Sequence, residues 1–304
     1  MEFRIKEIFN LTLVLFFLFL ISCAVIEEAP ISVNNTYVSI PDVHFESQLI
    51  EQGIDSDGVL NQQILKTDAE QVSRLDLNLH SHFGEISDLS GIEAFVHLSF
   101  LSAVGQQIDE IDLSANTKLD TVFLSGNDLS NIDISQNPNL VFLDLLSNEL
   151  NAITGLSQAP QLKELNVSWN RLEELQIQNA SIEKVLASHN QLSSIDTHGA
   201  LQLKSLLLTS NELTTVDFSA NPQLEVLVLS DNQLSSLNIE ENTHLKYLYS
   251  SSNALRHLDV SRNQVLIDLR VDRNPNLTCV KILNGQDIPT LSIDDEQVLK
   301  EECE

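Results

Sequence analysis

The sequence has few basic residues. Its 304 residues include 16 lysines and arginines against 44 aspartates and glutamates, which gives a net charge of −28. No basic patch is present to meet phosphate, so the composition argues against nucleic-acid binding. A strong negative charge also favours solubility over random association.

Motifs that carry catalysis or bind cofactors are missing as well. The chain has neither a glycine-rich phosphate loop nor a G-x-S-x-G nucleophile elbow. His80, His82 and His97 could meet, but their spacing fits no strong zinc pattern, and a metal site is the less favoured interpretation. We therefore expect no enzyme activity, no cofactor and no metal.

The dominant feature is a repeat of about 21 residues. From Leu119 the chain reads L-x-x-V-x-L-x-x-N-x-L-x-x-I-x-I-x-x-N, and nearly the same phrase then returns. Its first asparagine falls at Asn127, Asn148, Asn170, Asn190, Asn211, Asn232, Asn253 and Asn274. A fixed period of this length is the signature of a solenoid. A solenoid grows by adding coils, so the length of this chain does not indicate the number of its domains.

Each unit can be explained physically. Leu206 and Leu208 are two residues apart, so in a strand they point to the same face, which only stacked neighbours can bury. Asn211 follows at the turn, where its amide can pair with unsatisfied backbone groups. A second, less complete column is formed by Asn116, Asn137, Asn179, Asn221, Asn242 and Asn263. Aspartates also recur at one repeat position, which indicates a solvated column rather than an acid–base pair: Asp112, Asp133, Asp196, Asp217 and Asp259.

These motifs resemble the leucine-rich repeat family, and the phrase L-x-x-L-D-L-S-x-N resembles the short, internalin-like arrays of bacteria. The resemblance covers residues 72–278 and implies an α/β-type solenoid, mostly β and loop with few helices, with a parallel β-sheet on its concave face. Two weaker copies are expected at Val72-x-x-Leu75-x-Leu77 and Phe95-x-x-Leu98-x-Phe100, with loops near residues 80–87 and 104–107.

Residues 1–22 have the features of a signal peptide. Ile8 to Ile21 is an apolar run of 14 residues, short for a membrane span. It ends Leu-Ile-Ser-Cys23, which resembles the lipobox of bacterial lipoproteins and implies lipidation of Cys23; an ordinary signal peptide is the alternative. Ala24 then favours the outer membrane, and Glu27-Glu28 is weakly similar to a surface-export signal. The lipid anchor is the only membrane attachment that we expect.

Both ends of the array are expected to carry caps. After a tether at 23–40, residues 41–71 resemble the N-terminal cap of such lipoproteins, with a helix that starts at Pro41-Asp42 and stops at Gly53. The stretch 55–58 is either part of a calcium loop or, as we favour, a polar turn. With Cys23 assigned to lipid, two cysteines remain, so we predict a Cys279–Cys303 disulfide in a cap at 279–304 rather than two free thiols.

The repeat register also predicts a binding surface. Strand residues between the buried leucines should face the concave side, and several of them are apolar or aromatic where polar residues are expected. The predicted partner-binding residues are Phe123, Phe142, Leu186, Leu207, Val226, Val228, Tyr247, Tyr249 and Arg270. Contiguous exposed apolar patches usually mark interaction sites, although β-propensity or dimerisation would also explain them. In the same register, His97 and Ser99 are expected on the concave side, and Trp169 at its rim.

Two functions fit this sequence. The first is an envelope lipoprotein that binds a protein partner through its concave face. The second is a structural or accessory envelope protein that binds glycan or an envelope component. A continuous group of aliphatic side chains on the concave face favours the protein partner, whereas aromatic side chains favour a glycan. Because four aliphatic residues accompany two tyrosines, we favour the protein partner.

Overall fold

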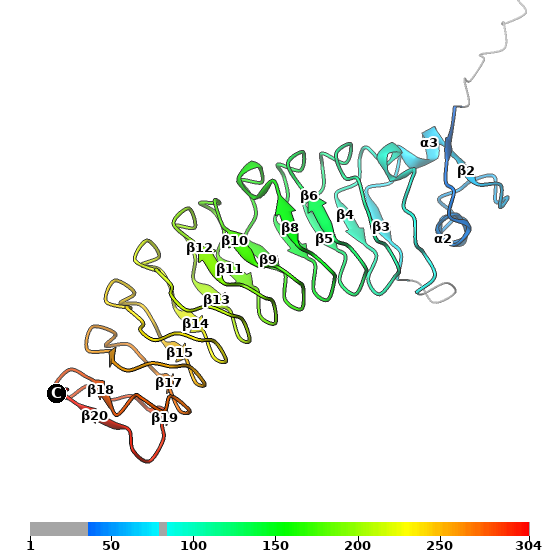
Figure 1. The fold of residues 1–304 in the computed structure, drawn as a ribbon. Helices are drawn as coiled ribbons and strands as arrows, with labels where there is room; N and C mark the ends of the chain where they lie inside the picture. The colour runs from blue at the N-terminus through cyan, green and yellow to red at the C-terminus, as the bar shows by residue number, and fades with distance from the viewer. Residues whose placement is uncertain (1–35, 79–83, 304) are drawn as a thin grey trace, which may run out of the picture. The chain divides into compact units, whose positions relative to one another are not determined.

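The computed structural model describes residues 36–78 and 84–303, and those from Thr36 onward form one compact unit. This unit is a solenoid of stacked coils (Figure 1). The predicted signal peptide, most of the tether and Cys23 lie outside the described residues, as do His80 and His82. Residues 37–39, expected in the tether, already belong to the fold as strand β1 (Tyr37–Ser39).

One parallel sheet of 11 strands runs the length of the solenoid and forms the predicted concave face. Its strands, in spatial order, are β3 (Arg74–Asp76), β4 (Phe100–Ser102), β5 (Thr121–Phe123), β7 (Phe142–Asp144), β9 (Glu164–Asn166), β11 (Lys184–Leu186), β13 (Ser205–Leu207), β14 (Val226–Val228), β15 (Tyr247–Tyr249), β17 (Asp268–Arg270) and β19 (Thr290–Ser292). The middle residue of each strand from β3 to β17 is buried, and the two outer residues of most of these strands are half-buried. The sheet therefore has one core face and one face open to a partner.

A second set of strands forms in several coils, most of them at the I-x-I segment. They pair in parallel as β6 (Asn131–Asp133) with β8 (Ala152–Thr154), β10 (Glu174–Gln176) with β12 (Ser194–Asp196), and β16 (Leu258–Asp259) with β18 (Cys279–Lys281) and β20 (Val298–Lys300). Two 3-10 turns, η2 (Ile92–Ala94) and η3 (Leu156–Gln158), also occur in the coils, and η3 directly follows β8. Gly155 precedes η3 at φ 96°, and a Cβ there would lie 2.3 Å from the Ser135 nitrogen. This close approach of two coils requires glycine.

The predicted asparagine ladder is confirmed. Asn211 is buried, and its Nδ2 donates to the carbonyls of Ala187 and Leu208 at 3.0 Å each, while its Oδ1 accepts from the Leu192 amide at 3.1 Å. Each ladder asparagine thus connects its own turn to the preceding coil through its side chain. The second column works similarly, since Asn242 Nδ2 donates to the carbonyls of Phe218 and Asn221. These amides satisfy backbone groups that the turns would otherwise leave unpaired in the core.

Our prediction for the second coil was three residues out of register. The buried triplet is Leu98, Leu101 and Ala103, so the concave positions are Phe100 and Ser102 rather than His97 and Ser99. The error arose because alanine replaces the last leucine and a glutamine replaces the ladder asparagine. Gln106 is buried, and its Nε2 donates to the Leu77 carbonyl at 3.0 Å. Glutamine therefore extends the ladder where the coil carries a longer loop.

The N-terminal cap closes the first coil. Helix α2 (Val43–Glu51) begins at Asp42, whose Oδ1 accepts from the amides of His44 and Phe45, and the chain turns away at Gly53 with φ 66°, as predicted. The antiparallel pair of β1 with β2 (Gln63–Leu65) and the short helix α3 (Lys66–Ala69) complete it. Gln48 and Gln52 donate to the carbonyls of Leu77 and Asp76. The cap therefore provides hydrogen bonds at the edge of β3, which would otherwise end the sheet.

The C-terminal cap continues the repeat and is closed by the predicted disulfide. Strands β19 and β20 extend the two sheets, and Gln297 Nε2 donates to the carbonyls of Val271 and Asn274, as a ladder asparagine would. Cys279, on β18, is bonded to Cys303, with 5.8 Å between their Cα atoms and a sequence separation of 24. The crosslink ties the last strand segment to the body of the solenoid.

Cys279→Ser is expected to destabilise the last coils before the rest. Closing a loop of this length stabilises by about 3 kcal/mol in the chain-entropy estimate, and solenoid stability is a sum of local and neighbouring contributions. Hydrogen exchange should quicken in β17–β20 and stay unchanged in β5–β9. A mass spectrum that finds both thiols free in protein isolated from its native cells would contradict a stabilising role for this disulfide.

Candidate functional site

The concave face has three zones, defined by the outward residues of neighbouring strands. An aromatic patch occupies the N-terminal coils: Phe100, Phe123 and Phe142. A polar band follows at Asp144, Glu164, Asn166 and Lys184. The apolar strip covers the next coils: Leu186, Leu207, Val226, Val228, Tyr247 and Tyr249. The structure thus places together the residues that we predicted, in two separate groups.

The apolar strip is continuous across four strands. Leu186, Leu207, Val228 and Tyr249 are direct neighbours along one row, and Val226 and Tyr247 are neighbours in the adjacent row. All six side chains are half-buried. Because the leucines beneath them already fill the interior, these residues do not belong to the core.

Tyr249 is held in place at the C-terminal end of the strip. Its hydroxyl donates to Asp268 Oδ2 at 3.0 Å, and the Arg270 guanidinium carbon lies 4.4 Å from its ring centroid. Arg270 also pairs with Asp268 at 2.9 Å, and hydrogen bonds from Arg270 lower the pKa of Asp268. Burial, together with the bond to Asp268, raises the pKa of Tyr249. The ring is therefore neutral and fixed in orientation, which lowers the entropy cost of binding against it.

The aromatic patch is a stack of three rings. The Phe123 centroid lies 5.7 Å from that of Phe100 and 4.9 Å from that of Phe142. At the outer end, the Arg74 guanidinium carbon lies 3.4 Å above the Phe100 ring. Each apolar group on the concave face therefore ends in an arginine stacked on an aromatic ring. Phe100 was missed from the sequence because of the register error.

Paired charges border the apolar strip on the side where each strand begins. We call the alternating residues Lys163, Glu183, Lys204, Glu225 and Lys246 the charge ladder. Glu183 bonds Lys163 at 3.2 Å and Lys204 at 2.7 Å, and Glu225 bonds Lys246 at 2.7 Å. Hydrogen bonds from Lys204 and Lys163 lower the pKa of Glu183. This border is nearly neutral in a strongly acidic protein, so it does not repel an anionic partner segment.

Small hydroxyl side chains border the strip on the other side. They follow each strand by two residues, and we call them the hydroxyl column: Ser168, Ser188, Thr209, Ser230 and Ser251. Ser188 Oγ accepts from the Thr209 amide, and Ser251 Oγ donates to Asp272. An apolar centre between polar borders is the usual anatomy of a protein interface. The sequence contained both columns at the repeat period, but only the structure shows that they flank the strip.

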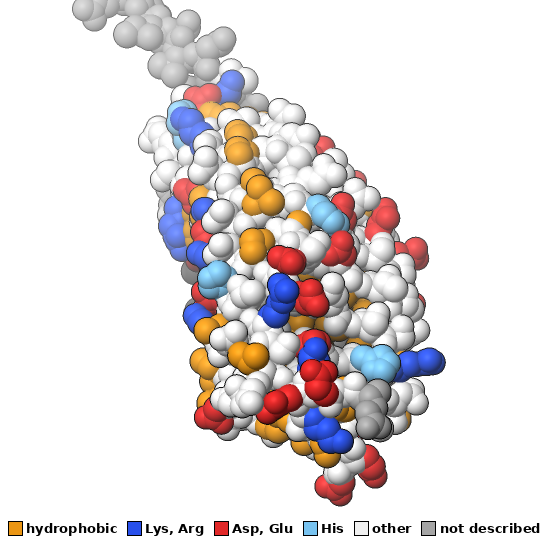
Figure 2. All heavy atoms as spheres, turned by 90° about the vertical axis from the view of Figure 1, so that its left-hand side faces the viewer, with side chains coloured by type: hydrophobic (Ala, Val, Ile, Leu, Met, Phe, Trp, Pro, Cys, Tyr) orange, Lys and Arg blue, Asp and Glu red, His pale blue; other side chains and the backbone are white. Residues whose placement is uncertain are grey.

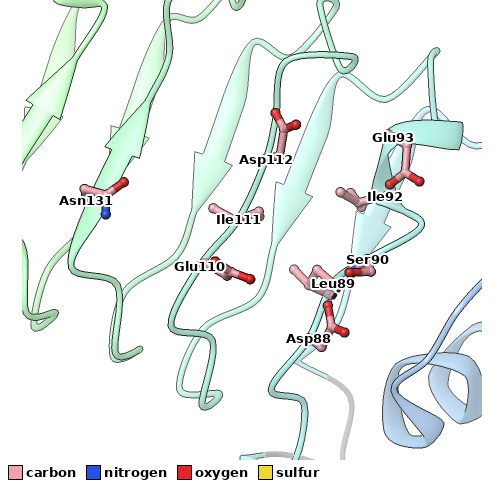
Figure 3. A pocket seen from close by; sticks show the side chains of 9 residues that line it. All are labelled: Asp88, Leu89, Ser90, Ile92, Glu93, Glu110, Ile111, Asp112 and Asn131. Carbon is pink, nitrogen blue, oxygen red and sulfur yellow. Dashed lines mark hydrogen bonds between the residues drawn. The ribbon is translucent and has the colours of Figure 1, made fainter.

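An acidic pocket of about 460 Å³ lies away from the concave face, against the outer segments of the first coils. Figure 3 shows Asp88, Leu89 and Ser90 on one segment, Glu110 and Asp112 on the next, and Asn131 beyond them on β6. Asp88 and Asp112 accept hydrogen bonds from the backbone amides two residues further on. These carboxylates stabilise local turns, and no group of three or more possible metal ligands occurs in residues 36–78 and 84–303.

The aspartate column is a structural feature, as predicted. Asp133 and Asp217 each accept a hydrogen bond from the amide two residues later, at 2.8 and 2.9 Å. Both side chains are exposed. Hydrogen bonds of this kind form Asx turns, which recur because the coil recurs. Figure 2 shows one face of the molecule, on which charged side chains of both signs and separate hydrophobic side chains are interspersed.

The stretch at 55–58 forms a hydrogen-bonded polar turn. Asp57 accepts from the Val59 amide and from Asn61 Nδ2, at 2.8 and 3.1 Å. Asp55 lies next to it, 3% exposed, and burial raises the pKa of its carboxyl to about 6, with repulsion from Asp57 as a second cause.

Asp55→Asn should stabilise the protein at neutral pH. A carboxyl with a raised pKa is charged above pH 6 at an unfavourable site, so stability falls as pH rises from about 4 through 6. We expect a gain of up to about 3 kcal/mol at pH 7, because each pKa unit corresponds to about 1.4 kcal/mol, and none at pH 4, where the native carboxyl is protonated. Urea denaturation at both pH values measures this. An equal effect of the substitution at both values would contradict a role for the charge.

Comparison with solved structures assigns the fold. Residues covering 86% of this chain superpose on 72% of the functional domain of InlJ from Listeria monocytogenes, with a TM-score of 0.55 and 22% identity. The protein has a leucine-rich repeat fold. No model of a known protein family matches the sequence, and no curated protein does either.

Other leucine-rich repeat structures agree. A leucine-rich repeat protein of Leptospira interrogans matches with a TM-score of 0.57 and 22% identity over 69% of this chain and 59% of its own. The LRIM1/APL1C complex matches with a TM-score of 0.59 and 25% identity, over 77% of this chain and 47% of that one. This leucine-rich repeat chain therefore spans less than two thirds of both. Within its described part, no helix has the length and hydropathy to cross a membrane.

Proposed function

We propose that this leucine-rich repeat protein is a non-enzymatic lipoprotein of the bacterial cell envelope that binds a protein partner on its concave face. The observation that carries the proposal is the apolar strip, which lies between the charge ladder and the hydroxyl column. Half-buried tyrosines suit such a role because aromatic residues are frequent binding hot spots. Tyr249 adds a pre-oriented ring at the end of the strip.

The structural comparisons support a partner that is a protein. The LRIM1/APL1C structure is that of a complex, and most of the length of this chain resembles part of that structure. The clustered carboxylates on the outer segments of the coils stabilise turns. This structural use agrees with a scaffold role. A second candidate is an envelope glycan, which the aromatic patch favours because ring faces can stack on sugars.

A pull-down distinguishes the two partners. The soluble array, produced without Cys23, is incubated with detergent extracts of envelope from the same cells and from surrounding cells. Treatment of the extract with protease should abolish capture, and an excess of neutral envelope oligosaccharide should leave capture unchanged. Capture that survives protease but is competed by the oligosaccharide would replace the protein partner with glycan.

Cys23→Ser should release the protein from the membrane fraction. The proposal places the chain in the outer membrane, with surface exposure as its most specific form, and makes the lipid on Cys23 the source of membrane affinity. Fractionation and mass spectrometry of the N-terminus measure the effect. Unchanged membrane partitioning of the variant, with an acyl-free N-terminus in the native protein, would contradict the anchor.

A further inference from the structure

An exposed pair of stacked rings lies at the rim of the concave face. The ring centroids of Trp169 and His189 are 3.9 Å apart, and their planes meet at 18°. Trp169 is the only tryptophan, and its side chain is 57% exposed. Each residue directly follows a member of the hydroxyl column, so Trp169 borders the polar band and His189 borders the first coil of the apolar strip. Our sequence reasoning placed Trp169 at the rim but missed its stacking on His189.

The backbone at this position makes the aromatic choice unusual. Trp169 and His189 have φ values of 58° and 56°, in the left-handed region. Most other coils have the same geometry here and use Ser147, Ser210, Asp231, Ser252 or Arg273. The left-handed turn is a feature of the repeat, and within it a bulky ring such as that of Trp169 is disfavoured. Since neither ring is buried in the core, packing of the interior does not explain them.

One face of the Trp169 ring is left open. His189 covers the side towards the following coil. On the preceding coil, in register with Trp169, stands Ser147, and on the coil before that stands Gly126. The coils stack without interruption here, because the Asn148 amide donates to the Trp169 carbonyl and the Gly126 amide donates to the Leu146 carbonyl. No large side chain therefore stands in register with the indole on these two coils, in agreement with the exposure of Trp169.

The acidity of the chain favours a cation over an anion at the open indole face. The chain carries a net charge of −28, and the two coils on the open side carry Asp128 and Glu149 two residues after Gly126 and Ser147. Arg171 pairs with Glu149 and offsets its charge, so the attraction comes from Asp128 and from the net charge of the chain. The face of an indole is electron-rich and attracts cations, arginine most often. An anionic ligand would find no comparable attraction.

We propose that Trp169, backed by His189, receives the guanidinium of an arginine side chain on the partner protein. This inference rests on the proposed function and adds to it a charge-selective contact at the rim. The partner segment would place apolar groups on the strip and an arginine over the open indole face. The site thus selects partners with a basic residue beside an apolar patch.

The test uses the single indole signal of Trp169 in a ¹⁵N-labelled sample of the full mature chain. The probe is N-acetyl-arginine methylamide, and the matched control probe is N-acetyl-citrulline methylamide, which has nearly the same shape without the charge. We expect a saturable shift with the arginine probe and binding about threefold weaker with citrulline. Equal binding of both probes, no saturable shift with arginine, or stronger binding of a neutral disaccharide would overturn the proposal.

Two variants locate the site. Ser147→Arg should place an intramolecular guanidinium over the indole and remove the response to the probe. Ser252→Arg makes the same charge change at the equivalent position of a distant coil, where the response should persist. Arg273 already occupies this repeat position with φ 57°, so both variants are compatible with the fold. An unchanged response in Ser147→Arg would overturn the location.

A failure of the guanidinium contact can be distinguished from a failure of the proposed function. Serine substitutions in the apolar strip at Val228, Tyr247 and Tyr249 lie at least two coils from His189 and should leave the indole titration unchanged. If that variant loses the partner while the arginine probe fails on the native protein, the binding face stands and the guanidinium contact falls. If the probe binds as expected while the strip variant retains the partner, the guanidinium site stands and the apolar strip is not the binding face.

Discussion

Asn211→Ala is expected to lower the free energy of unfolding by about 3 kcal/mol. The substitution removes three hydrogen bonds, to the carbonyls of Ala187 and Leu208 and from the amide of Leu192, all inside the solenoid. The backbone groups left behind are buried and have no access to water, which makes their loss more costly than that of an exposed bond. Urea denaturation followed by circular dichroism measures the change.

A matched control is Asn238→Ala. Asn238 is exposed and accepts one local bond from the Glu240 amide at 3.1 Å, so its removal should cost less than about 1 kcal/mol. If Asn211→Ala costs no more than this control, the ladder does not stabilise the stack. If the substitution costs more than the control, hydrogen exchange should quicken first in the coils that contact Asn211, since each coil is stabilised by its neighbours.

The triple change of Val228, Tyr247 and Tyr249 to serine should weaken partner binding by at least about 2 kcal/mol, roughly 30-fold. The fold should remain, because Leu227 and Leu248 fill the interior beneath these side chains. The Arg270–Asp268 pair needs no tyrosine to persist. Isothermal titration with the captured partner measures the affinity, and thermal melting checks the fold.

The control for this variant changes the aspartate column, Asp133, Asp217 and Asp259, to asparagine. The amide oxygen of asparagine can still accept the turn hydrogen bonds, so both fold and binding should be kept. Normal binding by the tyrosine variant together with failure of the aspartate variant would move the binding face to the other side of the coil. Unfolding of the tyrosine variant would mean that these side chains serve the core.

The sequence predicted the fold because the repeat specifies local and global structure together. Alternating leucines place buried residues on one face of each strand, and the asparagines follow at a constant distance, so strands from β5 onward were expected in the correct register. The second coil shows where matching the repeat motif residue by residue fails. Leu98 precedes Leu119 by 21 residues, so the period alone would have corrected its register, although Ala103 and Gln106 replace the residues that define the motif.

Features that depend on side chains from different coils could not be read from the pattern. The stack of Trp169 on His189 joins residues 20 positions apart, and requires both a left-handed backbone and a choice of rotamer. The contact of Arg270 with Tyr249 likewise depends on how two neighbouring strands orient long side chains. The apolar strip itself was predictable, because strand alternation decides which residues face outward.

A photo-crosslinker placed at Val226, in the centre of the apolar strip, tests the binding face most directly. A benzophenone side chain there should form a covalent product with the partner upon illumination. The same group at Asp217, which is exposed and lies outside the concave sheet, should form none. We predict a product from position 226 alone. A product from position 217 and none from position 226 would contradict binding at the concave face.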